Sequence, residues 1–491
     1  MATNGLNTRK LAGLIAGPVL FFLILFLFHP SGLSHQGKAV LAGTVWVGIW
    51  WITEAIPIPA TSLLPIIIFP LTGALNISDT TSAYGNSMVF LFMGGFMIAL
   101  SMEKWNLHKR IALTIINLVG TNTRNIILGF MLSAGLLSMW ISNTATTMMM
   151  FPIALAVSKQ FGDFFRREGI EASEAEERKF GIAIMLGTAY GASIGGIATL
   201  IGSPTNVVFS AVVKNYYKVS ISFADWFIIG LPISIMILFV CWFYLTRIAF
   251  KPAVSEFNQA RDTIRQELEK LGPMRAEEKK VLIVFSATAV LWITRTFLLR
   301  RLLPGIDDTI IAIIGAMVLF LIPGGKDDTL LDWKTARKLP WGILLLFGGG
   351  LAIANGFSNT DLSAWIGNGL IQYKGSPYII ILLIVTATVN YMTEITSNVA
   401  TASIMLPIIA SLCQALGLHP YGMMIAAAIS SSCAYMLPVS TPPNAIVFNS
   451  GYIRISEMAR KGFIMNILSI IIIVLYINYI FPHVWHLPDP F

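Results

Sequence analysis

Long apolar runs separated by short polar segments extend over almost the whole chain. Eleven of these runs are long and apolar enough to predict membrane-crossing helices. They cover residues 11–28, 39–56, 60–73, 87–102, 180–200, 226–249, 280–298, 308–323, 340–355, 421–437 and 463–482. Two further apolar stretches, 126–157 and 377–413, are longer than the others. A single helix of about 30 residues would be ~45 Å long, too long for a ~30 Å hydrocarbon layer.

Each of the two longer stretches has a polar phrase near its middle. The first reads SNTATTMMMFP (142–152), and the second reads SNVATASIMLP (397–407). Two half-length helices that meet at the polar phrase fit these stretches better than one continuous helix. We therefore expect two re-entrant hairpins, each of which enters and leaves the membrane on the same side.

Composition supports a polytopic membrane protein. Of the 491 residues, 55% are hydrophobic and 12% are charged, whereas soluble domains carry about 25% charged residues. The first run follows Arg9 and Lys10 and resembles a signal peptide, but no small-residue cleavage site follows it, so we interpret it as a retained span. The net charge of +8 predicts no nucleic-acid partner, since basic residues in membrane proteins mark cytoplasmic loops.

The loop charges give the predicted orientation. With the N-terminus in the cytoplasm and the C-terminus outside, 26 of the 33 Lys and Arg residues face the cytoplasm. The outside receives Lys38, Lys214, Lys218, Arg295, Arg300, Arg301 and Lys374. Counting either hairpin as a full span would invert everything after it and remove this asymmetry, so the positive-inside rule favours eleven spans plus two hairpins. The charged stretches 158–180 and 251–280 are expected to form amphipathic helices at the cytoplasmic interface.

Three motifs occur twice in the same order. The matched pairs are LFMGGFMIAL (91–100) with LFGGGLAIAN (346–355), SNTAT (142–146) with SNVAT (397–401), and GSPTN (202–206) with STPPN (440–444). The first two pairs share an offset of 255 residues (397 minus 142), and the third has an offset of 238 (440 minus 202). Each half thus contains an apolar span, a hairpin and a Pro-broken turn. The predicted hairpins open to opposite sides, and such inverted repeats with broken helices are typical of secondary transporters.

The polar tips can bind ions of either sign. At each tip one half-helix ends in unpaired carbonyl groups, which suit a cation, and another begins with unpaired N–H groups, which suit an anion. Pro204 and Pro442 interrupt further helices and free more carbonyl groups. Neither the tips nor the turns contain Lys or Arg, so an anion there would be held by neutral donors. Glu394, near the second tip, and Glu54 are acidic residues of the apolar regions, and we favour structural hydrogen bonds for both.

These residues resemble those of the divalent anion:sodium symporter family, the INDY-like di- and tricarboxylate transporters. The resemblance covers nearly the whole chain. It is carried by WWITEAIPIPATSLLP (50–65), AYGNSMVFLFMGG (83–95), NLHKR (106–110), SNTAT, SNVAT and SSCAYMLPVSTPPNAIV (431–447). Tyr435 stands in the last motif where the family more often has Phe.

The resemblance implies an all-α homodimer that works as an elevator, with a mobile transport domain sliding against a scaffold. The expected divisions are scaffold helices in 1–125, the first half of the transport domain in 126–250, a cytoplasmic amphipathic linker in 251–279, scaffold helices in 280–376, and the second half of the transport domain in 377–491. The expected partners are a dicarboxylate, the lipid bilayer and sodium as a candidate coupling ion, with no other cofactor.

The resemblance also implies the site residues. Expected substrate contacts are Ser142, Asn143, Thr144, Ser203, Pro204, Ser397, Asn398, Val399, Thr441 and Pro442. A first sodium site would comprise Ser138, Ser142, Asn143 and Gly202, and a second would comprise Thr393, Ser397, Asn398 and Ser440. Val399 departs from the fuller SNT pattern and removes a hydrogen bond worth about 0.5–1.5 kcal/mol.

The leading functional hypothesis is sodium-coupled uptake of C4 or C5 dicarboxylates such as succinate, malate, fumarate or 2-oxoglutarate across the plasma membrane. A sodium-independent dicarboxylate exchanger and a citrate or sulfate transporter are alternatives within the family. An integral-membrane enzyme would need a nucleophile–base pair or a metal cluster at membrane depth, and a channel would need a ring-forming filter motif. The sequence shows neither feature.

Overall fold

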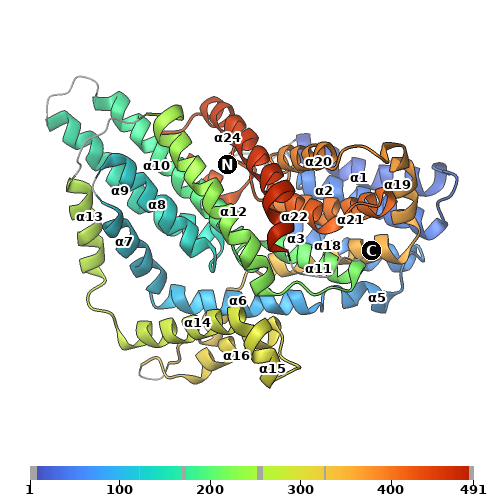
Figure 1. Ribbon diagram of the computed structural model, residues 1–491, viewed down its shortest axis with the longest axis horizontal. Coiled ribbons are helices and arrows are strands. Elements are labelled where there is room, and N and C mark those ends of the chain that lie inside the picture. The colour runs from blue at the N-terminus through green and yellow to red at the C-terminus, as the bar shows by residue number, and fades with distance from the viewer. Residues whose placement is uncertain (1–7, 121, 168–172, 252–257, 326–327, 486–491) are drawn as a thin grey trace, which may run out of the picture.

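The protein is all-helical, as the sequence predicts. The computed structural model describes residues 8–120, 122–167, 173–251, 258–325 and 328–485. Every named element in these ranges is a helix, and the only β-pairing among them is an isolated bridge between Pro323 and Thr329. Figure 1 shows the helices in an elongated molecule in which the two halves of the chain lie against each other.

Two series of helices repeat in the same order. The first comprises α6 (Ser87–Lys104), α7 (Leu107–Val119), α8 (Thr123–Ser138), α9 (Asn143–Arg167), α10 (Ser173–Gly195), α11 (Pro204–Tyr217) and α12 (Phe223–Phe243). The second comprises α18 (Trp341–Asn359), α19 (Leu362–Leu370), α20 (Tyr378–Met392), α21 (Asn398–Leu416), α22 (Pro420–Ser431), α23 (Pro442–Phe448) and α24 (Ile455–Leu475). The order of helices matches the repeat predicted from three short motifs over seven helices in each half.

The remaining helices lie before and between these series. They are α1 (Thr8–Leu27), α2 (His35–Thr53), α3 (Ile58–Thr61), α4 (Leu64–Leu71), α5 (Ile77–Ser82), α13 (Asn258–Lys270), α14 (Ala276–Thr294), α15 (Arg300–Leu302), α16 (Asp308–Leu321) and α17 (Trp333–Ala336), with α25 (Phe481–Val484) at the end. Short π- or 3₁₀-helical segments extend α12, α14, α19 and α24. The predicted span 60–73 is thus divided between α3 and α4.

Seven helical segments of the described residues are long and apolar enough to cross a membrane. They are Thr8–Leu27, Ile77–Lys104, Phe223–Ala249, Ala276–Leu302, Trp341–Asn359, Asn398–Leu416 and Ile455–Val484. Four shorter apolar segments accompany them, at Ile58–Leu71, Thr123–Ser138, Asp308–Leu321 and Tyr378–Met392. The chain is therefore a multi-pass membrane protein. The count of eleven spans stays a prediction, and the predicted sides of the two termini concern residues 1–7 and 486–491, which lie outside the described ranges.

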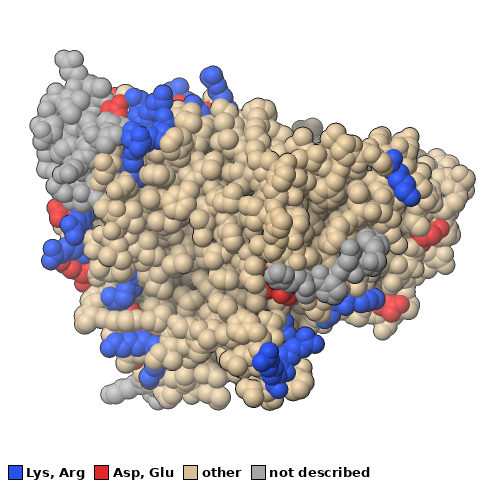
Figure 2. Space-filling model, in the orientation of Figure 1, with Lys and Arg blue, Asp and Glu red and all other residues tan. Residues whose placement is uncertain are grey.

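The surface has the character of a membrane protein. Large apolar side chains are exposed along several helices, for example Leu27 on α1 (73%), Leu71 on α4 (83%) and Ile283 on α14 (67%). Figure 2 shows charged side chains near the margins of the molecule and a broad uncharged region across its middle. Such extensive apolar exposure would be unfavourable in water and fits contact with lipid.

The two charged stretches are largely helical among the described residues. In the first stretch the described residues extend two longer helices, because α9 continues to Arg167 and α10 begins at Ser173. An ion pair between Arg166 and Glu177, at 3.1 Å, joins these two helices. The second stretch contains α13, which packs against α7 and α9 and is tied to α7 by the pair Lys109–Glu267 at 3.0 Å.

Matched glycines allow close helix crossings in both halves. A Cβ atom at Gly94 on α6 would lie 2.7 Å from Ala312 Cβ on α16, and one at Gly349 on α18 would lie 2.5 Å from the Ser62 carbonyl oxygen. The repeated GG motif therefore performs the same packing role twice. A close crossing of two backbones lies between α8 and α10, where a Cβ at Gly195 would lie 2.1 Å from the Gly135 oxygen.

We predict opposite effects for two glycine substitutions. Gly195→Ala should lower the thermal unfolding temperature in detergent by several degrees, because the new methyl group must push two backbones apart. Gly369→Ala on α19 is the matched control, since a Cβ there meets nothing within 4 Å. This control should be neutral or stabilising by up to ~1 kcal/mol, which is the usual cost of Gly inside a helix. Equal unfolding temperatures for the two variants would contradict the close crossing.

Candidate functional site

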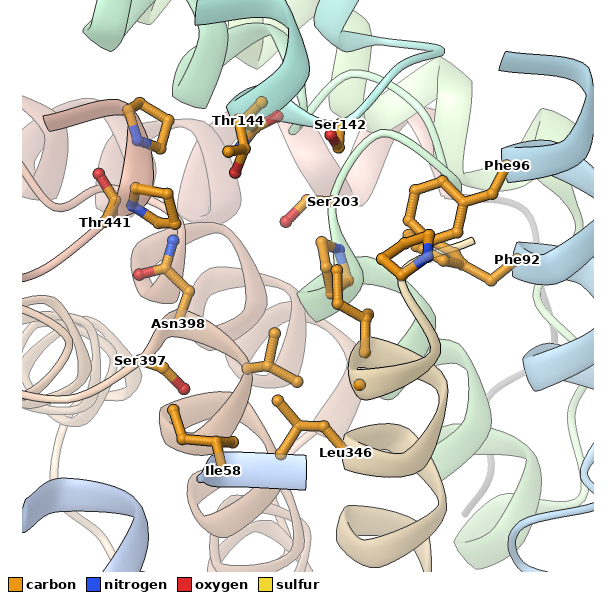
Figure 3. A pocket seen from close by; sticks show the side chains of 18 of the residues that line it. Ile58, Phe92, Phe96, Ser142, Thr144, Ser203, Leu346, Ser397, Asn398 and Thr441 are labelled. Carbon is orange, nitrogen blue, oxygen red and sulfur yellow. The ribbon is translucent and has the colours of Figure 1, made fainter. Parts of the chain in front are cut away.

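A cavity of about 350 Å³ lies where four helix interruptions meet. Two interruptions are the polar phrases, between α8 and α9 and between α20 and α21. The other two are the turns 196–203 and 432–441. All ten residues predicted to contact substrate line the cavity: Ser142, Asn143, Thr144, Ser203, Pro204, Ser397, Asn398, Val399, Thr441 and Pro442. Figure 3 shows several of their side chains around one open space.

The cavity has one polar wall and one apolar wall. The polar wall consists of the tips and turns just named, which all lie in residues 126–250 and 377–491. The facing residues come from 1–125 and 280–376 and are Ile58, Pro59, Phe92, Phe96, Pro340, Gly342, Ile343 and Leu346. Among the described residues, no charged side chain lines either wall.

The serine of each polar phrase caps the helix that follows it. The Ser142 hydroxyl oxygen accepts a hydrogen bond from the Ala145 N–H at 3.2 Å, and Ser397 accepts one from the Ala400 N–H at 3.2 Å. A serine at the N-cap accepts a hydrogen bond from one of the first N–H groups of the helix, which otherwise have no partner. Each hydroxyl hydrogen remains available to donate toward the cavity.

Two of the predicted sodium ligands lie beneath the cavity wall. Ser138 and Thr393 are completely buried, and neither lines the cavity. The Ser138 hydroxyl donates to the Asn143 side-chain oxygen, and the Thr393 hydroxyl donates to the Asn398 side-chain oxygen at 2.8 Å. The two halves therefore build the same hydroxyl–amide pair behind each tip.

The residues around these pairs are rich in oxygen atoms. A Cβ at Gly202 would lie 3.0 Å from the Ser138 carbonyl oxygen and 2.7 Å from the Gly196 oxygen, so only glycine leaves room between them. In the second half, the Thr393 hydroxyl also approaches the Ser431 oxygen at 2.7 Å. Oxygen ligands are what hard cations prefer, so both groups have donor sets that suit sodium.

The two acidic residues of the apolar regions have different environments. Glu394 is only 3% exposed and accepts hydrogen bonds from the Tyr435 N–H at 2.7 Å, the Met436 N–H at 3.0 Å and the Asn466 side chain at 2.8 Å. Its oxygens face N–H donors, which fits the structural role favoured from the sequence. Glu54, in contrast, is exposed and ends α2 in a left-handed conformation with φ of 49°, and its structural hydrogen bond stays a prediction.

Several polar residues of the site are not among those predicted. The Ser432 hydroxyl lies 3.0 Å from the Ser203 hydroxyl and 2.8 Å from the Thr205 hydroxyl, which joins the two interrupted turns. Asn206 and Asn444 are completely buried behind the same turns. The sequence does contain a signal for both asparagines, because they are the last residues of the matched motifs GSPTN and STPPN.

The fold and the cavity together define a polytopic membrane transport protein. The sequence matches the family model described as "Sodium:sulfate symporter transmembrane region" over residues 8–486. The chain therefore belongs to the sodium:sulfate symporter family, the divalent anion:sodium symporters. A sodium-dependent dicarboxylate transporter of Staphylococcus saprophyticus, SdcS, is 47% identical over 97% of this chain and 92% of its own length. The protein of the same name from Staphylococcus aureus is 46% identical over the same shares.

Solved transporter structures share the fold at low sequence identity. The Neisseria gonorrhoeae MtrF structure aligns with a TM-score of 0.59 and 14% identity, over 99% of this chain and 97% of that one. The Alcanivorax borkumensis YdaH transporter aligns with a TM-score of 0.55 and 12% identity, over 96% and 97% of the two chains. At such identities the likeness concerns the fold alone.

The cavity predicts a labelling pattern for single cysteine variants. Thr144→Cys should react with a water-soluble thiol reagent, because residue 144 lines the cavity, whereas Thr393→Cys should be protected by burial. The three natural cysteines, Cys241, Cys413 and Cys433, are all buried and should give little background. Mass spectrometry of the labelled protein measures the difference, and equal labelling of both variants would contradict the cavity.

Proposed function

We propose that the protein carries out sodium-coupled secondary active transport of C4 and C5 dicarboxylates across the plasma membrane. The observation that carries this proposal is the meeting of two polar tips, one from each repeat, at a single cavity of about 350 Å³. The names of the two staphylococcal relatives, sodium-dependent dicarboxylate transporters, support the choice of substrate class and ion. Succinate, malate, fumarate and 2-oxoglutarate are the substrates that we expect.

The two tips would hold the two ends of a dianion. Ser142, Asn143 and Thr144 would donate to one carboxylate, and Ser397 and Asn398 to the other. The N-terminal ends of α9 and α21 add unpaired N–H groups with favourable dipoles. Because these donors are neutral, the site binds its anion without a fixed positive charge, and the sodium ions held behind the tips would supply the compensating charge. Loss of sodium then weakens substrate binding and favours release.

The division of the cavity wall supports an elevator mechanism. All polar lining residues belong to 126–250 and 377–491, the proposed transport domain, and the lining residues from 1–125 and 280–376, the proposed scaffold, have no polar side chain. A domain that carries every hydrogen bond to its substrate can slide along an apolar wall without breaking any of them. The segment 251–279 would link the two halves on the cytoplasmic side.

Contacts at this domain boundary include ring contacts as well as hydrogen bonds such as the one from Asn215 to Asn355 at 2.8 Å. The ring of Trp140, at the first tip, packs against Trp292 and Phe285 of α14 with ring centroids 6.5 and 5.0 Å away. Ring contacts of this kind have no fixed hydrogen-bond register. At the second tip, the corresponding residue is Ile395, which is 57% exposed and whose carbonyl oxygen accepts from Arg9 at 3.3 Å. We further propose a homodimer with the N-terminus in the cytoplasm and the C-terminus outside.

Two other activities remain within the family. One is sodium-independent exchange of dicarboxylates, because the proposed sodium ligands are small polar groups and backbone atoms that do not require a cation gradient. The other is transport of citrate or sulfate. Both alternatives use the same cavity. A transport assay must therefore test separately whether uptake depends on sodium and which anion is transported.

We predict that proteoliposomes containing the protein take up succinate only when an inward sodium gradient is present. Asn143→Ala and Asn398→Ala should each abolish uptake while the protein still folds, because each loses a donor to one carboxylate and a ligand to one ion. Counterflow, in which the proteoliposomes are loaded with dicarboxylate, tests the alternative of a sodium-independent exchanger. Uptake driven by internal dicarboxylate and indifferent to sodium would establish the exchanger instead, and a response only to citrate or sulfate would replace the substrate class.

The difference between Thr144 and Val399 gives a second prediction for the same assay. Thr144→Val removes one donor from the first tip and should raise the half-saturating succinate concentration by up to about tenfold, as expected for loss of one net hydrogen bond. Val399→Thr restores the fuller motif and should lower that concentration or leave it unchanged. Both exchanges conserve side-chain shape. A lower half-saturating succinate concentration for Thr144→Val would show that the first tip does not bind a carboxylate through Thr144.

A further inference from the structure

Two buried asparagines hold the interrupted turns behind the cavity. Asn206 lies in the first turn of α11, directly after the turn 196–203, and Asn444 lies in the first turn of α23, directly after the turn 432–441. Both are completely buried. Neither lines the cavity, so neither is placed to touch a substrate there.

Each asparagine gathers several oxygen atoms of its turn with one NH₂ group. The Asn206 side-chain nitrogen donates to the Thr199 oxygen at 2.8 Å, the Gly196 oxygen at 3.0 Å and the Ile197 oxygen at 3.4 Å. The Asn444 nitrogen donates to the carbonyl oxygens of Ala434 and Leu437, both at 3.1 Å. It also donates to the Ser440 hydroxyl oxygen at 3.2 Å. The two repeats therefore use the same device.

The interrupted turns need such hydrogen-bond donors because of their backbone carbonyl groups. When a helix unwinds inside a protein, its carbonyl groups lose their N–H partners, and each buried carbonyl group left without a partner destabilises the fold. The NH₂ group supplies two hydrogens at a point where three oxygens converge. The Asn444 side-chain oxygen has no hydrogen-bond partner among the described residues, so this asparagine acts through its nitrogen.

The oxygens gathered in this way adjoin the proposed sodium sites. In the first half, the Gly196 oxygen lies 2.7 Å and the Thr199 hydroxyl 3.0 Å from the position of a Cβ on Gly202, and that hydroxyl also donates to the Met139 oxygen at the first tip. In the second half, Ser440 is itself a proposed ligand. An asparagine side chain that holds these oxygen atoms of the turn in place also fixes the distance between the turn and the tip.

We infer that Asn206 and Asn444 are positioning residues that set the sodium affinity of the two sites, one in each repeat, without coordinating the ion. The inference rests on the proposed sodium-coupled transport. In this arrangement the neutral NH₂ group holds the outer oxygens of each turn, so that the remaining oxygens face the ion at a fixed spacing. Loss of the NH₂ group frees the turn, and the site must then be organised again each time that sodium binds.

The test uses Asn206→Asp and Asn444→Asp, which keep the side-chain shape but replace the NH₂ group with an oxygen that faces other oxygens. Half-saturating sodium for succinate uptake should rise about tenfold or more in each, the effect of losing one to two hydrogen bonds. The maximal rate at saturating sodium should stay within about threefold. Asn206→Ser and Asn444→Ser, which keep one donor, should show smaller increases.

Sodium-induced thermal stabilisation without substrate is the second readout, since ligand binding to the folded state raises apparent stability. The matched control is Ser210→Ala, also on α11 and completely buried, whose hydroxyl donates to the Ile221 oxygen away from the turn. This variant should keep the natural sodium dependence even if its unfolding temperature falls.

The outcomes separate the inference from the function on which it rests. A natural protein that ignores sodium in both assays would contradict the proposed coupling. A natural protein that responds to sodium, with Asp and Ser variants whose half-saturating sodium stays within about twofold of it, would contradict the positioning role. Failure of all four variants to yield folded protein would also contradict it, because the asparagines would then be requirements of folding and not of ion affinity.

Discussion

The structure depends on one constraint: backbone groups freed inside an apolar protein must find partners. Four helices are interrupted at the same place, and each interruption exposes N–H and carbonyl groups that neither water nor lipid satisfies at that depth. Ser142 and Ser397 cap the helices after the tips, and Asn206 and Asn444 gather the carbonyl groups of the turns. The polar side chains that satisfy the interruptions thus form, or directly support, the polar wall of the cavity.

The two halves share this geometry although their residues differ. Each tip is tied to the turn that follows it, but by different chemistry. In the first half the Thr199 hydroxyl donates to the Met139 oxygen, and in the second half the carboxylate of Glu394 accepts the N–H groups of residues 435 and 436. Glu394 corresponds to Met139 in the repeat. The acid is therefore best explained as an anchor of the second tip, and the two tips need not bind their ligands equally.

The separation of polar and apolar walls relates structure to transport. Hydrogen bonds from a static wall would have to break whenever the substrate moved past it, and each would add to the barrier. In this protein the segments 1–125 and 280–376 contribute only apolar side chains, proline and glycine to the cavity. In the proposed mechanism, this arrangement would concentrate substrate binding on one set of elements and let that set slide along the other.

The sequence by itself determined the helical class, the two polar phrases, the Pro-broken turns and the repeat, because apolar periodicity, helix-breaking residues and matched motifs are local features. It also indicated ten of the residues that form the polar wall. Only the tertiary structure decided that Ser138 and Thr393 lie beneath that wall, that Glu54 is exposed, and that Ile58, Phe92 and Leu346 form the opposite wall. These features depend on which distant helices pack together. An apolar residue that faces lipid, a neighbouring helix or a cavity has the same appearance in the sequence.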